Sequence, residues 1–299
     1  MSGRLRRSSK RRRRWQPHGE PASPSSKQRP GFSRWRAGPR ANRTRVTASA
    51  SSSTPSQRVS PHHRSSPPAP RSMGELDQPS VVAFPLRGEW TVERTPAHRI
   101  PSHGTDILGQ RYAYDFIRTD TRAGSRVHPA GRLRWLLIGG RTQDCYGWGE
   151  PIHSATDGEV VVAVDGVAER QWVHVARESW AALKTVRSYR RSKNPRLLAG
   201  NHVLIRAANL FSLYAHLAPA SVAVTEGDRV CTGDLIGRVG HTGNSTSPHL
   251  HFHLMDSADP LRARGIPCAF SEYLVEQDGR WEHVQNGIPR RHQRVRFGA

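Results

Sequence analysis

Residues 247–254 read Ser-Pro-His-Leu-His-Phe-His-Leu, an alternation of histidine and apolar side chains that is typical of a β-strand. Because side chains alternate between the two faces of a strand, His249, His251 and His253 share one face. The other face is apolar and is predicted to pack on a core, so that the histidines line a cleft or meet solvent. Residues two apart lie roughly 6–7 Å apart at Cα, close enough to serve one metal ion and one substrate. The plainer alternative is a chance histidine cluster on an exposed strand.

Residues 212–217, Ser-Leu-Tyr-Ala-His-Leu, alternate in a similar way upstream of this strand. The pattern predicts that Ser212, Tyr214 and His216 share one face. A single histidine in such a strand is more often structural than functional, so His216 is a candidate only in combination with the downstream histidines.

A third segment places a loop histidine before an aromatic strand. Residues 102–106 read Ser-His-Gly-Thr-Asp, and residues 110–116 read Gln-Arg-Tyr-Ala-Tyr-Asp-Phe. A carboxylate such as Asp115 is costly inside an aromatic strand unless it is paired or bound to a metal. Two histidines and a carboxylate are ligands that Zn²⁺ takes, and a catalytic zinc site leaves a further position for water. We therefore expect one zinc ion per chain.

The remaining sequence predicts a mostly β fold, with an antiparallel or mixed β-sheet, because short β-branched or alternating runs are bounded by Gly, Pro, Asn and Asp. The predicted strands are Ser80–Phe84, Arg111–Arg118, Arg134–Ile138, Gly158–Val164, His202–Ala207, Leu210–His216, Asp234–Val239 and His249–Met255. One segment, Ala168–Arg191, has apolar residues at three- and four-residue spacing and is predicted to be a helix inserted between strands.

Residues 224–237 contain two Gly-Asp pairs six residues apart, which separate short apolar segments. Such turns reverse the chain within a few residues and indicate a small, folded-over β sandwich. Biotin and lipoyl carrier domains share this pattern, but they display a lysine at the hairpin tip. The corresponding turn, Cys231–Asp234, has no lysine, which argues against a carrier.

The charge divides the 299-residue chain, of net charge +22, into a tail and a body. Residues 1–72 hold 18 Lys or Arg and one acidic residue, whereas residues 73–299 hold 28 Lys or Arg and 23 acidic residues. The tail, rich in Arg, Ser and Pro, has too few apolar residues to form a core and is predicted to be disordered. It could bind anionic polymers nonspecifically by counterion release, or simply be solvated. Met73 is an alternative start of translation.

Other sequence features narrow the classes of protein. No apolar run approaches the roughly 18 residues of a membrane-spanning helix, so we expect no integral membrane segment. No signal peptide is visible, because the basic start is not followed by an apolar stretch. Three cysteines without CxxC spacing argue against a disulfide framework, and we expect them to be buried apolar residues.

These motifs together resemble the M23 zinc metallopeptidases, the lysostaphin/LytM-type peptidoglycan endopeptidases. The matching residues are Ser-Pro-His-Leu-His-Phe at 247–252, Tyr-Ala-His-Leu at 214–217, the Gly-Asp run at 227–237, Gly-Asn-Ser-Thr at 243–246 and the segment 147–158 that begins Gly-Trp-Gly. The resemblance covers about residues 83–275 and implies a LytM-like domain within residues 73–299. The basic tail has no counterpart in the family.

The resemblance implies a role for each matching residue. It makes His251 a zinc ligand, and His249 and His216 the catalytic histidines. The family's other ligands are a histidine and an aspartate four residues apart, and here the pattern departs, because His103 precedes Asp106 by three residues and Asp115 by twelve. We favour Asp115, since its strand matches the family's aspartate-bearing strand. His253 stands where the family often has Glu, and is expected to support the ligands or the structure.

The sequence therefore predicts a zinc-dependent endopeptidase that hydrolyses peptide bonds in peptidoglycan cross-links or stem peptides. The resemblance implies an extracellular or cell-wall location, and we expect a monomer. The alternative is a non-catalytic LytM-fold domain that binds the cell wall or regulates other wall enzymes. A nucleic-acid-binding protein is a third interpretation, driven by the tail alone, because the body has no recognised nucleic-acid motif.

Overall fold

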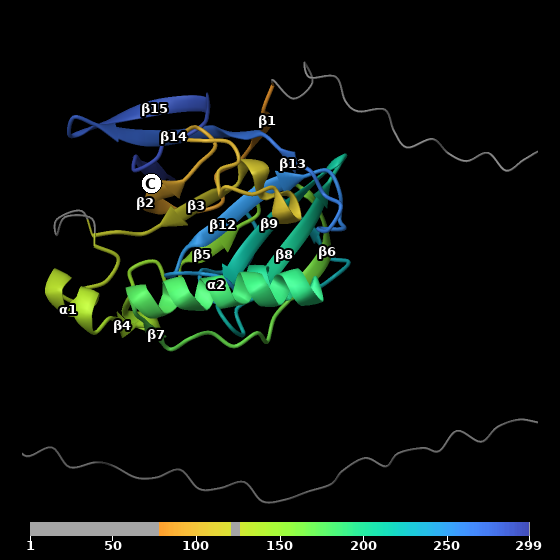
Figure 1. Ribbon diagram of the computed structural model, residues 1–299. Coiled ribbons are helices and arrows are strands. Elements are labelled where there is room, and N and C mark those ends of the chain that lie inside the picture. The colour runs from red at the N-terminus through yellow and green to blue at the C-terminus, as the bar shows by residue number, and fades with distance from the viewer. Residues whose placement is uncertain (1–77, 121–125, 299) are drawn as a thin grey trace, which may run out of the picture. The chain divides into compact units, whose positions relative to one another are not determined.

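The computed structural model describes residues 78–120 and 126–298 (Figure 1). The predicted disorder of residues 1–72 and their predicted binding of anionic polymers lie outside the described residues. No helix in the described part of the chain is long and apolar enough to cross a membrane.

The described residues form a mostly β structure with few helices. The strands are β1 (Ser80–Val82), β2 (Gly88–Arg94), β3 (Tyr114–Ile117), β4 (Gly140–Arg141), β5 (Pro151–His153), β6 (Gly158–Val164), β7 (Trp172–Val173), β8 (Asn201–Ala207), β9 (Leu210–Leu217), β10 (Arg229–Val230), β11 (Leu235–Arg238), β12 (Leu250–Met255), β13 (Gly265–Ile266), β14 (Cys268–Gln277), β15 (Arg280–Gly287) and β16 (Arg294–Phe297). The helices are α1 (Arg132–Leu137), α2 (Val175–Ser192) and α3 (Arg196–Ala199), with 3₁₀ turns η2 (Ile107–Tyr112) and η3 (Thr142–Asp144).

Most of the strands belong to one large mixed sheet with the order β1-β14-β16-β2-β3-β12-β9-β8-β6-β10. Strand β13 pairs with β12, and β15 pairs with β14. Among the described strands, only the β1–β14 pair is parallel. The predicted mostly β fold with a mixed sheet is confirmed.

The main hydrophobic core lies on one face of this sheet. Leu250, Phe252 and Leu254 of β12 are fully buried there, as their alternation predicts. The small sheet formed by β5 and β11 packs Ile152 and Ile236 into the same core and so forms the second layer of a sandwich. The histidine face of β12 must therefore point to the opposite side of the sheet.

That opposite side carries a smaller apolar cluster beneath helices α2 and α3. The cluster comprises Ala199, Leu204, Leu213, Ala215 and Met255. Helix α2 runs across this side of the molecule, near strands β8 and β9 (Figure 1). A cleft between the sheet and α2 is the setting of the candidate site.

Three predicted elements were wrong in type or extent. In the predicted strand Arg111–Arg118, Arg111 and Tyr112 belong to the 3₁₀ turn η2, and the strand itself covers only Tyr114–Ile117. The predicted strand Arg134–Ile138 is instead part of helix α1, because its Leu and Arg residues are good helix formers and it has no strand partner. The predicted helix Ala168–Arg191 begins only at Val175, because residues Trp172 and Val173 pair with β4 as strand β7. His174 caps this helix by accepting a hydrogen bond from the backbone N–H of Arg177.

The cysteine prediction was partly wrong. Cys145 and Cys268 are buried, as expected, and burial raises the pKa of each thiol to about 12. Cys231 is exposed, in the turn after β10. All three thiols are free.

Candidate metal centre and active site

Asp115 and His251 lie directly opposite each other on the paired strands β3 and β12. Directly opposed residues of an antiparallel pair project from the same face, so the register brings the two side chains together. His251 Nδ1 lies 2.9 Å from Asp115 Oδ1. The main core occupies the other face of both strands, with Tyr114 and Phe116 on β3. The apolar alternation of the two strands thus fixes the position of the polar pair.

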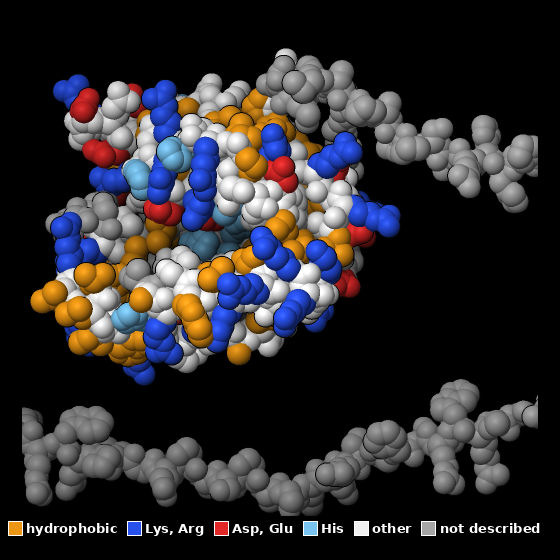
Figure 2. All heavy atoms as spheres, viewed as in Figure 1, with side chains coloured by type: hydrophobic (Ala, Val, Ile, Leu, Met, Phe, Trp, Pro, Cys, Tyr) orange, Lys and Arg blue, Asp and Glu red, His pale blue; other side chains and the backbone are white. Residues whose placement is uncertain are grey.

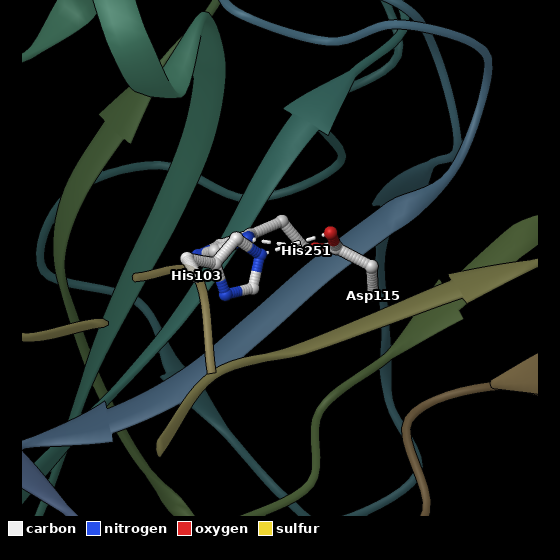
Figure 3. A group of neighbouring side chains, drawn as sticks. All are labelled: His103, Asp115 and His251. Carbon is white, nitrogen blue, oxygen red and sulfur yellow. Dashed lines mark hydrogen bonds and ion pairs between the residues drawn. The ribbon is translucent and has the colours of Figure 1, made fainter. Parts of the chain in front are cut away.

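His103 completes a three-residue group from the loop before η2 (Figure 3). Its Nε2 atom lies 2.9 Å from Asp115 Oδ2, while its Nδ1 atom lies 3.0 Å from the hydroxyl of Ser102. One ligand atom from each of His103, Asp115 and His251 lies within 4.8 Å of the others. Asp106, the alternative acidic candidate, forms an exposed ion pair with Arg111 instead.

The donor set of this group fits a divalent transition metal such as zinc. Two imidazole nitrogens and one carboxylate make up a common catalytic zinc site. Burial alone would raise the pKa of Asp115, but the charges of His103 and His249 outweigh it and hold this pKa well below its ordinary value. Asp115 is therefore ionised, as a metal ligand must be.

A hydrogen bond to His253 fixes the orientation of the His251 ring. Its Nε2–H donates to the carbonyl oxygen of Leu108 at 3.1 Å, so in the neutral ring Nδ1 is an acceptor. His251 Nε2 lies 3.1 Å from that acceptor and is thus the donor. The lone pair of His251 is then on Nδ1, the atom that faces Asp115. Burial lowers the pKa of His253 well below its ordinary value, which keeps this ring neutral.

His216 and His249 lie beside the group, with ring centroids 4.8 Å apart. His249 Nε2 is 3.6 Å from Asp115 Oδ1, and the His216 and His251 ring centroids are 5.7 Å apart. The structure therefore brings all five predicted site residues together.

The predicted shared face of Ser212, Tyr214 and His216 is wrong at His216. His216 is the extra residue of a β-bulge, because Leu217 pairs with Asn201 while Ala215 already pairs with His202. Its φ of 67° is left-handed, a conformation that is uncommon for residues other than glycine. Tyr214 enters the main core, whereas the bulge turns His216 into the cleft. Bulges often redirect a side chain in this way beside active sites.

Carbonyl oxygens fix the tautomers of both histidines. His216 Nδ1 lies 2.9 Å from the carbonyl of Thr242, and His249 Nδ1 lies 2.7 Å from that of Ser247. A carbonyl can only accept, so each Nδ1 carries the hydrogen and each neutral ring keeps its lone pair on Nε2. Burial, together with the charges of His249 and His251, lowers the pKa of His216 well below its ordinary value. Burial also lowers the pKa of His249, but the charge of Asp115 outweighs it and gives a net rise.

The cleft above these groups has a volume of about 340 Å³. Figure 2 shows histidine side chains at the base of a hollow whose rim carries Lys and Arg. Helix α2 contributes Ala182, Val186 and Arg190 to the lining, and β2 contributes Arg94. Arg94 Nε lies 3.4 Å from Asp115 Oδ2. Sequence reasoning missed this wall, although the four-residue spacing of Ala182, Val186 and Arg190 marks one face of the helix.

Comparison with known proteins shows what part of the chain is similar to. The model of peptidase family M23 matches residues 181–263, which include His216, His249 and His251. The chain is 40% identical over 76 residues to a peptidoglycan DD-endopeptidase, ShyA, of Vibrio cholerae, covering 24% of this chain and 17% of the relative. It is 49% identical over 80 residues to the DD-carboxypeptidase/endopeptidase Mpg of Neisseria meningitidis, and the match covers 26% of this chain and 18% of the relative.

A third relative is the glycyl-glycine endopeptidase ALE-1 of Staphylococcus capitis, 51% identical over 57 residues, with 19% of this chain and 15% of the relative covered. The chain spans less than a fifth of the length of each of these relatives. The matched segment nevertheless contains three of the five histidine and aspartate residues of the site. These matches show that residues 181–263, which hold His216, His249 and His251, are similar to peptidase family M23.

Proposed function

We propose that this protein is a zinc-dependent endopeptidase that hydrolyses peptide bonds in peptidoglycan cross-links or stem peptides. The observation that carries the proposal is the convergence of His103, Asp115 and His251 beside two further histidines at the base of one cleft. The substrate class comes from the relatives, since all three are endopeptidases by name and one is a peptidoglycan DD-endopeptidase. Residues 73–299 are proposed to be the catalytic domain, with its core at about 83–275, acting as a monomer.

His103 Nε2, Asp115 and His251 Nδ1 are the proposed ligands of one zinc ion per chain. When bound, zinc supplies a Lewis acid that polarises a carbonyl and lowers the pKa of water toward neutrality. His253 and the Leu108 carbonyl hold His251 in the tautomer that leaves Nδ1 free. The hydroxyl oxygen of Ser102 accepts from His103 Nδ1–H, which leaves Nε2 of His103 free.

His249 and His216 are the proposed catalytic residues. Each keeps its Nδ1 hydrogen bonded to a carbonyl oxygen, so Nε2 is the atom that exchanges a proton. One of the two takes the proton of the attacking water, and the pair stabilises the tetrahedral oxyanion and returns a proton to the leaving amine. Helix α2 walls the cleft and reduces access of bulk water to these rings.

Zinc content of matched variants tests the division of roles. We expect about one zinc per chain in the wild type and in His216→Ala, and none in His251→Ala. Hydrolysis should be lost in both variants. The control is His202→Ala, which removes a buried histidine of the neighbouring strand β8 and should keep zinc and activity. Full activity of either site variant would overturn the assignment, and a zinc-free, inactive wild type would favour a non-catalytic wall-binding domain.

Residues 1–72 are proposed to bind anionic polymers nonspecifically, because they hold 18 basic residues and one acid. Binding of the full chain to a polyanion such as heparin should fall steeply with salt concentration. Deletion of residues 1–72 should remove it and leave hydrolysis of soluble substrate fragments unchanged. Salt-insensitive binding would contradict the proposal.

A further inference from the structure

Helix α2 begins with a buried carboxylate that the proposed mechanism does not use. Glu178 lies in the first turn of the helix and is only 3% exposed. Its Oε2 atom accepts a hydrogen bond from Arg170 Nε at 2.6 Å and lies 3.3 Å from Nε2 of the fully buried His241. Burial raises the pKa of Glu178, but hydrogen bonding to His241 and the charge of Arg170 outweigh it, so Glu178 is ionised.

Arg170 and Glu169 bind the turn that precedes the catalytic strand β12. Arg170 donates to the carbonyl oxygens of Gly243 at 3.1 Å and Ser245 at 2.6 Å. Glu169 accepts from the backbone N–H of His241 at 3.0 Å and from the indole of Trp148 at 2.8 Å. Residues just before and within α2 are therefore bonded to the turn at residues 240–247.

A path of close polar contacts leads from this carboxylate to His249. His241 Nδ1 lies 2.9 Å from the hydroxyl oxygen of Ser245, and that oxygen lies 3.1 Å from His249 Nδ1. Ser245 and His241 are both essentially inaccessible to solvent. The path from Glu178 to His249 thus involves only two intermediate side chains.

The proton positions near His249 follow from the Ser247 carbonyl, which can only accept. The Ser245 hydroxyl donates to that carbonyl at 2.7 Å, so the Ser245 oxygen accepts from His249 Nδ1–H and from His241 Nδ1. His241 Nε2 lies 3.3 Å from both Glu178 Oε2 and Arg170 Nη2, and Nη2 also donates to the Ser245 carbonyl.

We infer that Glu178, His241 and Ser245 are positioning residues of the active site, which act together with the Ser247 carbonyl to hold the catalytic His249 in the tautomer that leaves Nε2 free toward the metal centre. The inference rests on the proposed function, because it assigns these residues to the same site. It gives the start of helix α2 a role in catalysis beyond forming the cleft wall. The logic is that of a carboxylate that orients a catalytic histidine, here through a second histidine and a serine.

The tautomer of His249 tests the inference without an activity assay. Long-range ¹H–¹⁵N spectra of the zinc-loaded full chain, labelled at histidine nitrogens, separate the Nδ1–H and Nε2–H forms, and His249→Gln identifies the His249 signals. We expect the Nδ1–H form in the wild type and a larger share of the Nε2–H form in Ser245→Ala. The control is Ser212→Ala, which removes another buried hydroxyl, 3.2 Å from the Thr156 hydroxyl, and should leave His249 unchanged. An unchanged His249 in Ser245→Ala would overturn the inference.

Kinetics of peptide-bond cleavage give a second, independent readout. Ser245→Ala and Glu178→Gln should each lower kcat, by about tenfold to a hundredfold for Ser245→Ala, with KM and zinc content unchanged. Because Ser245 connects Glu178 and His241 to His249, the double variant Glu178→Gln/Ser245→Ala should have a kcat no lower than that of Ser245→Ala alone. Glu159→Gln, which alters an exposed pair with Arg206 at 2.7 Å, is the matched control and should retain wild-type kcat.

The outcomes separate the two claims. Multiplicative losses in the double variant would show that Glu178 acts only as a structural residue, and would overturn the inference while the proposed function stands. A wild-type chain that binds zinc but cleaves no peptidoglycan would overturn the proposed function, and the His249 spectra would still decide whether the path of polar contacts sets its tautomer.

Discussion

Asp115 is the residue on which the candidate site depends. It is 6% exposed and lies within 3.6 Å of polar nitrogens from His103, His249, His251 and Arg94. A buried carboxylate without such partners would be strongly destabilising. Burial and the neighbouring imidazoles lower the pKa of His216 and His251, and the charge of Asp115 opposes this shift.

His253 gives a prediction at this scale. His253→Leu keeps the volume roughly but removes the acceptor for His251 Nε2–H. We expect zinc affinity, measured by competition with a chelator of known affinity, to fall about 10- to 100-fold. His253→Gln should lose much less, because its amide can both accept from His251 and donate to the Leu108 carbonyl.

The control for that experiment is His202→Leu on β8, a buried histidine whose Nδ1 contacts the Gly200 carbonyl and not a site residue. It should leave zinc affinity unchanged. Equal losses in the two leucine variants would mean that His253 acts through general stability and not through His251.

Residue-level alternation could be predicted well where the strands are regular. The histidine face of β12 and the position of Asp115 follow from the two-residue period, because β3 and β12 are straight through the site. His216 could not be placed this way, since the bulge and its φ of 67° reverse the pattern at one residue. The place of His103 depends on a loop whose length carries no periodic signal.

At the scale of elements, the end of helix α3 and the turn at residues 242–243 approach each other closely. Gly200 has a φ of +66°, and a Cβ atom there would lie 2.6 Å from the backbone nitrogen of Gly243. This contact positions the turn whose Thr242 carbonyl binds His216. The approach requires glycine both for its backbone conformation and for space.

Gly200→Ala should therefore lower the free energy of unfolding by about 3 kcal/mol, combining left-handed strain with overpacking. Gly166→Ala is the matched control, because Gly166 has a φ of +87° but open space around it, and should cost only about 1 kcal/mol. Urea denaturation of both variants measures the difference. Equal losses would contradict the close approach.

Element types could be predicted where local and tertiary signals agree. Strands β6, β8, β9 and β12 match their predicted runs closely. The run Arg134–Ile138 was too short for its apolar content to distinguish strand from helix, and its helix-forming residues decided the outcome. Helix α2 begins later than its periodicity suggests, because backbone pairing with β4 holds Trp172 and Val173 in a strand.

For the whole molecule, buried histidines couple stability to pH. Burial lowers the pKa of both His202 and His241 below the ordinary value of 6.5. Below pH 6.5 the unfolded chain therefore binds more protons than the folded chain, so stability falls as the pH falls. Each histidine contributes a slope of at most about 1.4 kcal/mol per pH unit.

Urea denaturation of the chelator-treated chain between pH 8 and 5 measures this effect without metal release. We expect a plateau above pH 6.5 and a decline below it, and a shallower decline in His202→Gln. A stability that is constant or rises on acidification would contradict the proposed neutrality of these rings.

The arrangement of the whole sheet could be predicted less well than its parts. The motifs indicated a mixed sheet with a small folded-over layer, and both are present. The parallel pairing of β1 with β14, and the neighbouring positions of β16 and β2, join residues about 190 or more apart in sequence. No local pattern encodes such pairings, because they depend on which edges remain free after the central strands assemble.

The central claim, that the chain is a metallo-endopeptidase, is tested most directly by the release of new amino termini from purified peptidoglycan by the zinc-loaded full chain. We predict release that a chelator abolishes and added zinc restores, with His216→Ala inactive despite bound zinc. Release that continues in the chelator, or the absence of release from peptidoglycans of every cross-link type tested while zinc is bound, would contradict the account.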